Sequence, residues 1–376
     1  MPSPSTSRWA ARSVSGRLPD FPWDKLTAYA ARAQAHPDGI VDLSVGTPVD
    51  PTPEVVQEAL RGAADSPGYP LTIGRADTRQ ACIDWLGRTF GVTGLDLDAI
   101  LPVIGSKELI ASLPTHLGLG AGDLVVYPEL AYPTYEVGAV LAGATPRATD
   151  SLTSLGPEVP ALVWLNSPSN PTGRVLPPEH LRKVVDWCRE RGVLVVSDEC
   201  YLECVWEGSA TSVLHPDVCG GDHSGLLAVH SLSKRSNLAG YRCAFAAGDP
   251  AVVGELLAVR KNLGLQMPGP QQVAMKAALD DDAHVGEQHA RYLERRSKLR
   301  TALESAGFTI EHSEAALYLW VTRGESCWDT VGALADRGIL VAPGEFYGAA
   351  GARHVRVAFT ATDERVDAAV SRLAAV

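Results

Sequence analysis

The sequence predicts an α/β fold in which a large, doubly wound, mostly parallel sheet domain is joined to a smaller α+β domain. Three observations lead to this prediction. Short apolar runs alternate with amphipathic helical patterns up to about residue 260. A proline- and glycine-rich segment at residues 267–270 interrupts this alternation, and a mixture of helices and strands follows it. The length of 376 residues also exceeds what one small core supports.

The strands of the large sheet are predicted from short, fully apolar runs. These runs cover residues 101–104, 124–127, 161–165, 193–198 and 226–229. Helices are expected between them, and an earlier strand at residues 40–46 ends in Gly46. In the smaller domain a long helical pattern at 271–305 precedes strands at 317–321, 338–341 and 354–359, with a helix at 328–335.

Three segments follow from these elements. Residues 1–47 are expected to form an N-terminal arm that joins the small domain, residues 48–268 the large domain, and residues 269–376 the small C-terminal domain. The first seventeen residues are rich in Ser, Pro and Arg, which favours a disordered leader over a secretory signal or an organellar transit peptide. Residues 18–23 place two aromatic residues among prolines, and both a docking arm and ordinary core packing explain them.

Composition excludes several classes of function. The formal net charge of −11, without a basic block, argues against a nucleic-acid partner. No apolar run is long enough to span a membrane, so no membrane association is expected. The seven scattered cysteines indicate free thiols in a reducing, cytoplasmic location. Cys200 and Cys204 lack a second ligand pair nearby, and no metal site is predicted.

Polar residues follow several of the predicted strands, at the edge where open parallel sheets bind ligands. Gly105, Ser106 and Lys107 open a helix directly after strand 101–104, and such a helix start can bind an anion. Asp198 ends strand 193–198. It is either a helix cap or a partner for a cationic nitrogen.

Ser231, Ser233 and Lys234 follow strand 226–229. A lysine beside two serines can capture an aldehyde while the hydroxyls bind an anion, and the planar guanidinium of Arg242 can hold a phosphate. On local grounds alone, a solvated loop lysine is by far the more common explanation of Lys234, and the rest of the chain has to support a catalytic role. The loop at residues 166–173 is dense in turn formers, and its Asn170–Pro171 bond is a candidate for the cis form.

Four features occur in one order: Asn170-Pro-Thr-Gly, Asp198-x-x-Tyr201, Ser231-x-Ser-Lys234 and Arg242. Their intervals are 28 (198 minus 170), 36 (234 minus 198) and 8 residues (242 minus 234). With the helix that opens at Gly105, this pattern resembles the class I and II aminotransferases over nearly the whole chain. The resemblance implies the PLP-dependent transferase fold type I, pyridoxal 5'-phosphate (PLP) as cofactor, small amino acid and 2-oxo acid substrates, and a homodimer.

The resemblance also implies a role for each residue that matches the family pattern. Lys234 would hold PLP as a Schiff base and later move a proton at the substrate. Asp198 would keep the pyridine nitrogen protonated. Asn170 and Tyr201 would hydrogen-bond the phenolic oxygen of the ring, and Tyr132 would stack on the ring.

The remaining implied contacts lie at the two ends of the cofactor–substrate pair. The phosphate would be held at the start of the helix, by the two serine hydroxyls, by an arginine, and by a tyrosine from the neighbouring subunit: Gly105, Ser106, Lys107, Ser231, Ser233, Arg242 and Tyr69. Arg356 would bind the substrate α-carboxylate, and Gly46 would line the same pocket. The alternative for Arg356 is an exposed strand arginine.

A narrower resemblance concerns segments 18–23, 41–48, 103–108, 128–134 and 341–347, which are similar to the actinobacterial succinyldiaminopimelate transaminases. Those enzymes exchange the amino group of glutamate with N-succinyl-2-amino-6-oxopimelate in diaminopimelate and lysine biosynthesis. Two departures, the missing leucine before Arg75 and Ala316 in place of a glycine, would reshape the substrate pocket. Candidates for binding the remote part of that substrate are Phe21, Trp23, Arg75 and Lys107.

Other functions remain open from the sequence. An aminotransferase for another amino acid carries the same motifs, and carbon–sulfur lyases and cyclopropane-carboxylate synthases share the fold and the lysine. A ligand-sensing regulator fused to a DNA-binding domain fits poorly, because only about forty residues precede the strand that ends at Gly46.

Overall fold

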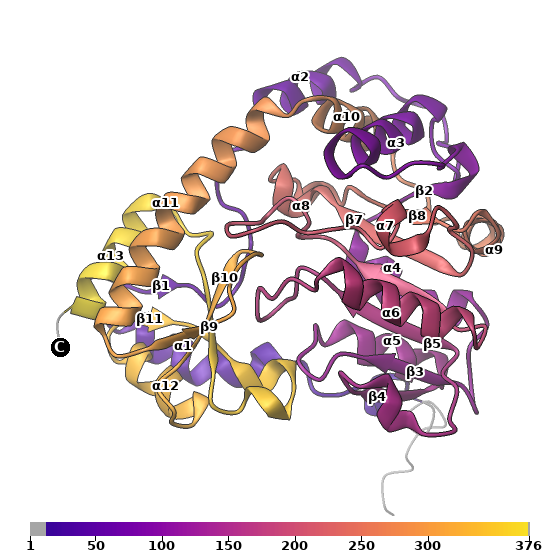
Figure 1. Ribbon diagram of the computed structural model, residues 1–376. Coiled ribbons are helices and arrows are strands. Elements are labelled where there is room, and N and C mark those ends of the chain that lie inside the picture. The colour runs from indigo at the N-terminus through magenta and orange to yellow at the C-terminus, as the bar shows by residue number, and fades with distance from the viewer. Residues whose placement is uncertain (1–12, 375–376) are drawn as a thin grey trace, which may run out of the picture.

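A computed structural model describes residues 13–374, and Figure 1 shows a large sheet with its helices beside a smaller α+β body. The large sheet has seven strands, and β8 alone runs antiparallel to its neighbours. Across the sheet the strands are β2 (Ile100–Val103), β8 (Ala244–Gly248), β7 (Leu226–Ser231), β6 (Leu194–Asp198), β5 (Leu162–Asn166), β3 (Leu124–Tyr127) and β4 (Thr145–Ala148). The predicted mostly parallel α/β class is therefore confirmed.

Both faces of this sheet are covered by helices. Along β5, Leu162 and Trp164 belong to one apolar cluster, while Val163 and Leu165 belong to the cluster on the opposite face. A strand buried on both sides explains why the sequence shows continuous apolar runs and not alternation. The covering helices are α2 (Glu54–Gly62), α3 (Ala76–Phe90), α4 (Ser106–His116), α5 (Thr134–Ala142), α6 (Pro178–Arg189), α7 (Pro216–Cys219), α9 (Pro250–Leu263) and α10 (Gly269–Asp280).

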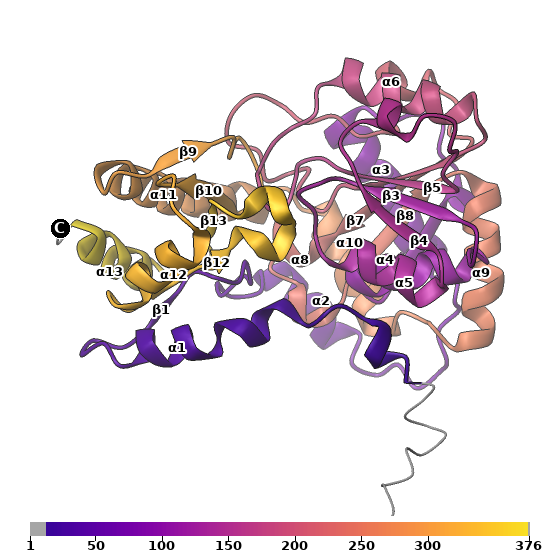
Figure 2. The same ribbon diagram turned by 90° about the horizontal axis from the view of Figure 1, so that it is seen from below.

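The smaller body contains an antiparallel sheet of four strands, in the order β12 (Ala342–Pro343), β13 (Val355–Ala358), β10 (Tyr318–Thr322) and β9 (Thr309–Glu311). The N-terminal segment returns to it, because β1 (Val41–Asp42) pairs in parallel with β11 (Ile339–Leu340). Its helices are α1 (Thr27–Gln34), α11 (Ala283–Ser305), α12 (Cys327–Ala335) and α13 (Asp363–Ala374). Figure 2 shows α1 along the lower side of this body, beside α12 and β1.

The predicted long helix at residues 271–305 is wrong as a single element. Asp281 and Asp282 separate α10 from α11, and only α11 reaches the small body, where Tyr292 and Leu299 join its core. The α10 helix instead packs on α2 and α3, with Met275 in the core of the large sheet. The division at residue 268 stays a prediction, and this packing favours a limit at the α10–α11 junction.

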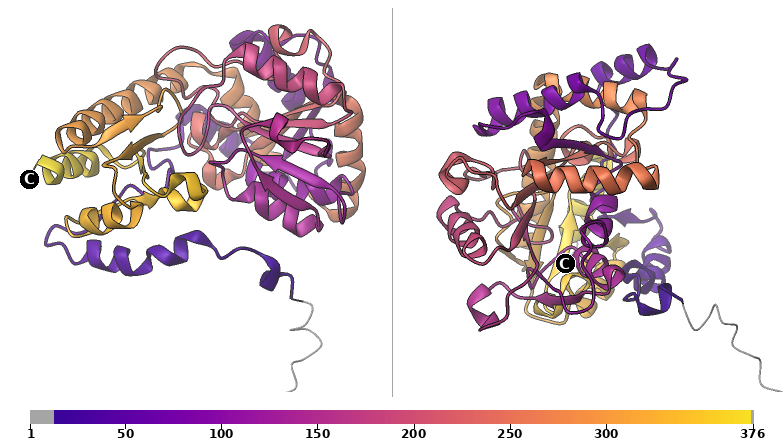
Figure 3. Two further views of the ribbon diagram at one scale, coloured as in Figure 1. Left: turned by 60° about the horizontal axis from the view of Figure 1, so that its bottom comes forward. Right: turned by 90° about the vertical axis from the view of Figure 1, so that its right-hand side faces the viewer.

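The N-terminal arm runs along the small body toward the large sheet, as Figure 3 shows. The Trp23 ring packs 5.4 Å from the Phe346 ring, whereas Phe21 is half exposed. Residues 1–12 of the predicted leader lie outside the described residues, and Ser15–Arg17 forms a short 3₁₀ turn. Within residues 13–374, no helix is both long and apolar enough to cross a membrane.

Candidate active site

A cavity of about 530 Å³ lies at the carboxyl edge of the large sheet, where that sheet meets the small body and the arm. All but two of the residues predicted for the site line this cavity. They are Gly46, Ser106, Lys107, Tyr132, Asn170, Asp198, Tyr201, Ser231, Ser233, Lys234, Arg242 and Arg356. Segments more than three hundred residues apart in sequence are thus brought to one place.

Lys234 stands in the short helix α8 (Leu232–Arg235), directly after β7. Ser231 caps this turn: its hydroxyl accepts from the Ser233 amide at 3.2 Å and donates to the Ser233 hydroxyl at 2.9 Å. The Lys234 amine donates to the carbonyl oxygen of Gly46, so it reaches across the cavity. A Cβ at Gly46 would lie 2.4 Å from the Tyr318 hydroxyl, which explains the glycine there.

The start of α4 forms an anion site with Arg242. Gly105 adopts φ +102° between β2 and α4, and a Cβ on it would lie 2.1 Å from the Arg242 guanidinium. The guanidinium therefore packs against the backbone where the first amides of α4 lack helical partners. The hydroxyls of Ser231 and Ser233 line the same cavity. This combination suits a phosphate group.

Asp198 is a buried carboxylate at the end of β6. Its oxygens accept from the Tyr135 hydroxyl at 2.8 Å and from the Cys200 amide at 3.1 Å. Burial raises the pKa of Asp198 despite these hydrogen bonds. A positively charged ring nitrogen beside it would offset that cost, so the site suits a pyridinium.

Arg356, on β13, is 3% exposed. It donates to the Asn170 side chain and to the Ser44 carbonyl, both at 2.7 Å, and its Nε has no hydrogen-bond partner among the described residues. The predicted cis bond at Asn170–Pro171 is present, and Ser167–Pro168 is cis as well. A buried guanidinium with unused donor capacity can bind a carboxylate.

Tyr318 is a cavity residue that the sequence reasoning missed. Its ring lies 3.8 Å below the Arg356 guanidinium, and its hydroxyl is 2.8 Å from that of Tyr201. Burial opposes ionisation of Tyr318, but the charges of Arg356 and Lys234 outweigh it and lower the pKa of this phenol. The strand register is the feature that identifies Tyr318 as a site residue. Trp320 pairs with Arg356, so Tyr318 lies diagonally beside Arg356.

Comparison with known proteins shows that residues 38–373 match the family described as aminotransferase class I and II. This match agrees with a site that suits a phosphate, a pyridinium and a carboxylate. This chain belongs to that family. It is therefore a PLP-dependent aminotransferase that acts on amino acid and oxo acid substrates.

Three similar proteins give the scale of the relationship. The aminotransferase is 64% identical to a "probable aminotransferase" of Mycobacterium tuberculosis, over 97% of its own length and 87% of the relative's. It is 59% identical to the 4-dedimethylamino-4-oxo-anhydrotetracycline transaminase of Streptomyces rimosus, with coverage of 95% and 99%. The solved structure of a "probable N-succinyldiaminopimelate aminotransferase" of Thermus thermophilus superimposes with a TM-score of 0.84 at 27% identity, covering 94% and 100% of the two chains.

Some predicted residues of the aminotransferase lie elsewhere. Tyr69 is 99% exposed in a surface loop and does not line the cavity, and Gly105 lies behind Arg242. Of the candidates for a remote substrate group, Phe21, Trp23 and Lys107 line the cavity. Arg75 does not, because it forms an ion pair with Asp77 on the surface.

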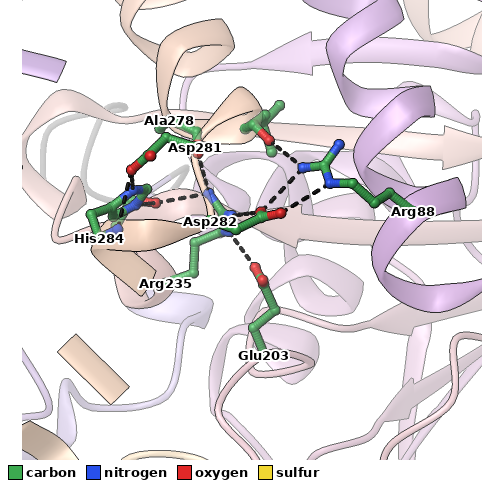
Figure 4. Close-up of polar contacts among 9 residues, drawn as sticks. Arg88, Glu203, Arg235, Ala278, Asp281, Asp282 and His284 are labelled. Atoms are coloured by element: carbon green, nitrogen blue, oxygen red, sulfur yellow. Dashed lines mark hydrogen bonds and ion pairs between the residues drawn. The ribbon is translucent and has the colours of Figure 1, made fainter. Parts of the chain in front are cut away.

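The lysine-bearing turn of the aminotransferase is also tied to the α10–α11 junction, as Figure 4 shows. Arg235, next to Lys234, is buried, forms an ion pair with Glu203 and donates to the Ala278 carbonyl at 2.6 Å. Asp282 lies 3.6 Å from Arg235 and binds Arg88 through two hydrogen bonds. These contacts connect α8 to the α10–α11 junction.

Proposed function

We propose that this aminotransferase transfers the amino group of L-glutamate to N-succinyl-2-amino-6-oxopimelate, in the biosynthesis of diaminopimelate and lysine. One observation supports a substrate with an α-carboxylate. The Arg356 side chain is buried and incompletely hydrogen-bonded, and it lines the same cavity as Lys234. The choice of acceptor is supported by the sequence resemblance to succinyldiaminopimelate transaminases and by the likeness to the Thermus thermophilus structure.

In this proposal the protein holds PLP by its two ends. The start of α4 at Gly105, Ser106 and Lys107 holds the phosphate, together with the hydroxyls of Ser231 and Ser233 and the guanidinium of Arg242. Asp198 would lie at the ring nitrogen and keep it protonated, because a buried carboxylate favours a neighbouring positive charge. Tyr132 would stack on the ring, and Asn170 and Tyr201 would hydrogen-bond its phenolic oxygen.

The bound cofactor supplies a reactive aldehyde and a ring that withdraws electrons from the substrate Cα. Lys234 would hold the cofactor through its amine, and the free amine would take the proton from the substrate Cα and return a proton nearby. Arg356 fixes the α-carboxylate through two parallel hydrogen bonds and so orients the Cα–H bond toward Lys234. Gly46 leaves room for the substrate at this point.

A homodimer completes the site in this proposal. Tyr69 is almost fully exposed, so its side chain is free to contact a neighbouring subunit. We infer that its hydroxyl reaches the phosphate of the neighbouring subunit. All seven cysteines are free thiols, which supports the expected cytoplasmic location.

The test is the half-reaction with L-glutamate in the absence of an acceptor. A change in the visible spectrum of the bound cofactor, with one equivalent of 2-oxoglutarate released per site, supports glutamate as the donor. Turnover with the succinylated oxo acid then supports the acceptor. An unchanged spectrum would exclude glutamate, and release of ammonia or pyruvate from a cysteine-like substrate would favour a carbon–sulfur lyase.

A second acceptor is favoured by one observation, the 59% identity to the Streptomyces rimosus transaminase over almost its full length. The name of that relative implies a ketone on a polycyclic ring system as its substrate. If the succinylated oxo acid is not turned over while a ring ketone of this class is, the second candidate replaces the first.

A further inference from the structure

A second cavity, of about 480 Å³, adjoins the active-site cavity and has no role in the mechanism described above. We call it the arm cavity, because residues 18–23 and Lys25 of the N-terminal arm form one of its walls. The opposite walls come from α4, from the start of α5, and from residues 345–348. The arm cavity is distinct from the active-site cavity, because Lys234 lines the active-site cavity and does not line the arm cavity.

The two cavities share four lining residues, and these define a neck between them. They are Phe21, Trp23, Lys107 and Tyr132. The Lys107 amine lies 5.8 Å from the centre of the Phe21 ring and 6.0 Å from that of Tyr132. No carboxylate of the described residues pairs with Lys107 at ion-pair distance, so its charge is available to a ligand in the neck.

The arm cavity has a mostly aromatic wall. Ring centres follow one another from Phe21 to Trp23 at 5.7 Å, from Trp23 to Phe346 at 5.4 Å, and from Phe346 to Trp328 at 5.8 Å. Tyr127 and Tyr347 also line it. Such walls bind planar groups, including amides and rings, by stacking.

Two buried polar groups in this wall lack hydrogen-bond partners within residues 13–374. They are the indole Nε1 of Trp23 and the hydroxyl of Tyr347, and both can donate a hydrogen bond. Buried donors are nearly always paired in native proteins. Both atoms have almost no accessible surface in the structure, so a ligand oxygen would reach them only after neighbouring side chains of the wall move.

Charges at the rim are mixed. Asp20, Glu129, Glu136 and Glu345 line the arm cavity together with Lys25 and Lys107, and Glu345 already accepts from the Trp328 indole at 2.7 Å. A ligand with several negative charges in the arm cavity itself would meet these carboxylates. Lys107 is the charged residue among the four that define the neck, so a single anionic group of the ligand is expected there.

From these observations we infer that the arm cavity is the subsite for the remote part of an elongated acceptor, and that Lys107 determines specificity at the neck. The occupant is a planar, oxygen-bearing group, such as an acyl amide, joined to the reacting oxo acid through a carbon that carries a carboxylate. This inference rests on the proposed function, because it describes the acceptor of the same reaction. The specificity role is assigned to the side chain of Lys107, whereas the proposed phosphate contact uses the backbone amide of the same residue.

The first test fills the arm cavity with Val137→Trp, a substitution at its α5 wall. Unreactive analogues, in which a methylene replaces the ketone, are titrated into the holoenzyme by calorimetry. Analogues with a succinyl-amide or a benzoyl-amide tail are expected to bind roughly tenfold or more weakly to this variant, while the half-reaction with glutamate changes less than about twofold. Val55→Trp, at an exposed position of α2 that lines neither cavity, is the matched control.

The second test uses Lys107→Met, which keeps the length of the side chain and removes its charge. Two analogues that differ only in a carboxylate or a carboxamide beside the tail measure the interaction at the neck. Native enzyme is expected to prefer the carboxylate roughly tenfold, and the variant is expected to lose this preference. Because Lys107 is exposed, folding is expected to be unaffected, and a melting curve checks this.

The outcomes separate the two proposals. If both tails depend on Val137 and Lys107 but the succinylated oxo acid is not turned over, the arm-cavity inference stands and the proposed substrate falls. If Val137→Trp weakens glutamate and the long analogues equally, or leaves the long analogues unchanged in a folded protein, the inference is overturned. Retention of the carboxylate preference by Lys107→Met would overturn the role of Lys107.

Discussion

The active-site cavity has two walls of different construction. The wall formed by the large sheet, which we call the cofactor wall, carries Asp198 at the end of β6 and Lys234 in α8, which follows β7. The opposite substrate wall carries Gly46, Tyr318 and Arg356, which meet only because β1, β10 and β13 assemble in the small body. One sheet positions the first wall, whereas the second depends on how the small body and the arm sit against the sheet. If the proposed roles hold, we expect that the substrate can change with little effect on the cofactor site.

The largest expected effect is on the cofactor wall, at Lys234. Lys234→Ala removes the proposed proton carrier and the amine that binds the aldehyde. We expect kcat for glutamate-dependent transamination to fall by roughly 10³-fold or more. The visible spectrum of the protein mixed with PLP is measured beside the rate and should lose the band of the lysine-bound cofactor.

Lys183→Ala, on the exposed face of α6, is the control for loss of a lysine charge and should retain full activity. Residual activity of Lys234→Ala near the native level would show that another amine takes this role. It would also remove the reason for assigning chemistry to the cofactor wall.

On the substrate wall, Arg356→Gln tests whether substrate binding can be separated from the cofactor site. A glutamine cannot form two charge-assisted hydrogen bonds with a carboxylate, so kcat/KM for glutamate should fall by roughly 10²-fold, mostly through KM. The affinity for PLP, measured by equilibrium dialysis, should change less than about threefold.

Arg353→Gln is the matched control, because Arg353 lies three residues away and is exposed. It should leave both quantities unchanged. A large loss of PLP affinity in Arg356→Gln, with no change in KM, would contradict the division of the cavity into two walls.

The same difference between the walls explains what the sequence could predict. Asp198 and Lys234 follow apolar strands of one sheet, so their order along the chain places them at one edge. Tyr318 could be assigned only from the register of β10 against β13, which the sequence does not reveal. Strand β4 was missed because it is short, partly exposed and contains Pro146 and Arg147.

Other differences have physical causes in tertiary contacts. Strand β8 was not predicted because it consists of alanine and glycine around Phe245, a composition with low strand propensity, and its neighbours β2 and β7 stabilise it. The break between α10 and α11 occurs in a helical pattern and is held by the contacts of Asp281 and Asp282 with His284 and Arg88. Such contacts cannot be predicted from the local periodicity of apolar residues.

A smaller effect is expected behind the cofactor wall, at Tyr135. Its hydroxyl donates to Asp198 at 2.8 Å and opposes the rise in the pKa of that carboxyl that burial causes. Tyr135→Phe removes this hydrogen bond, so the pKa of Asp198 should rise further. We expect the acid limb of the kcat/KM profile to move to higher pH, with a loss of activity of about threefold to tenfold at neutral pH.

The control for this change is Tyr29→Phe, in α1, whose ring stacks on Trp328 far from Asp198. It should leave the pH profile unchanged. A uniform loss of activity in Tyr135→Phe, without a shift of the acid limb, would mean that Tyr135 acts through packing and not through Asp198.

The smallest effect on activity, and a separate effect on stability, is expected at Glu199, the residue after Asp198. Glu199 does not line the cavity, and its Oε1 accepts from the Val213 amide at 2.7 Å. Its Oε2 and both nitrogens of the adjacent His230, 3.6 Å away, lack hydrogen-bond partners in the described part of the chain. Burial raises the pKa of Glu199 to about 7 and lowers the pKa of His230 to about 3.

The raised pKa of Glu199 sets the sign of its contribution to stability. The folded protein keeps the proton between the ordinary pKa of the carboxyl and about 7, while the unfolded chain releases it, so the free energy of unfolding falls as the pH rises through this range. Glu199→Gln stays neutral and keeps the acceptor for Val213. The free energy of unfolding of the variant, measured by urea unfolding, should therefore rise relative to that of the native protein by about 1–3 kcal/mol from pH 5 to pH 8. The kcat of the variant should stay within about twofold of the native value. A gain of equal size at both pH values would contradict titration of Glu199 as its cause, and a large loss of kcat would mean that the cofactor wall extends behind the strand to this residue.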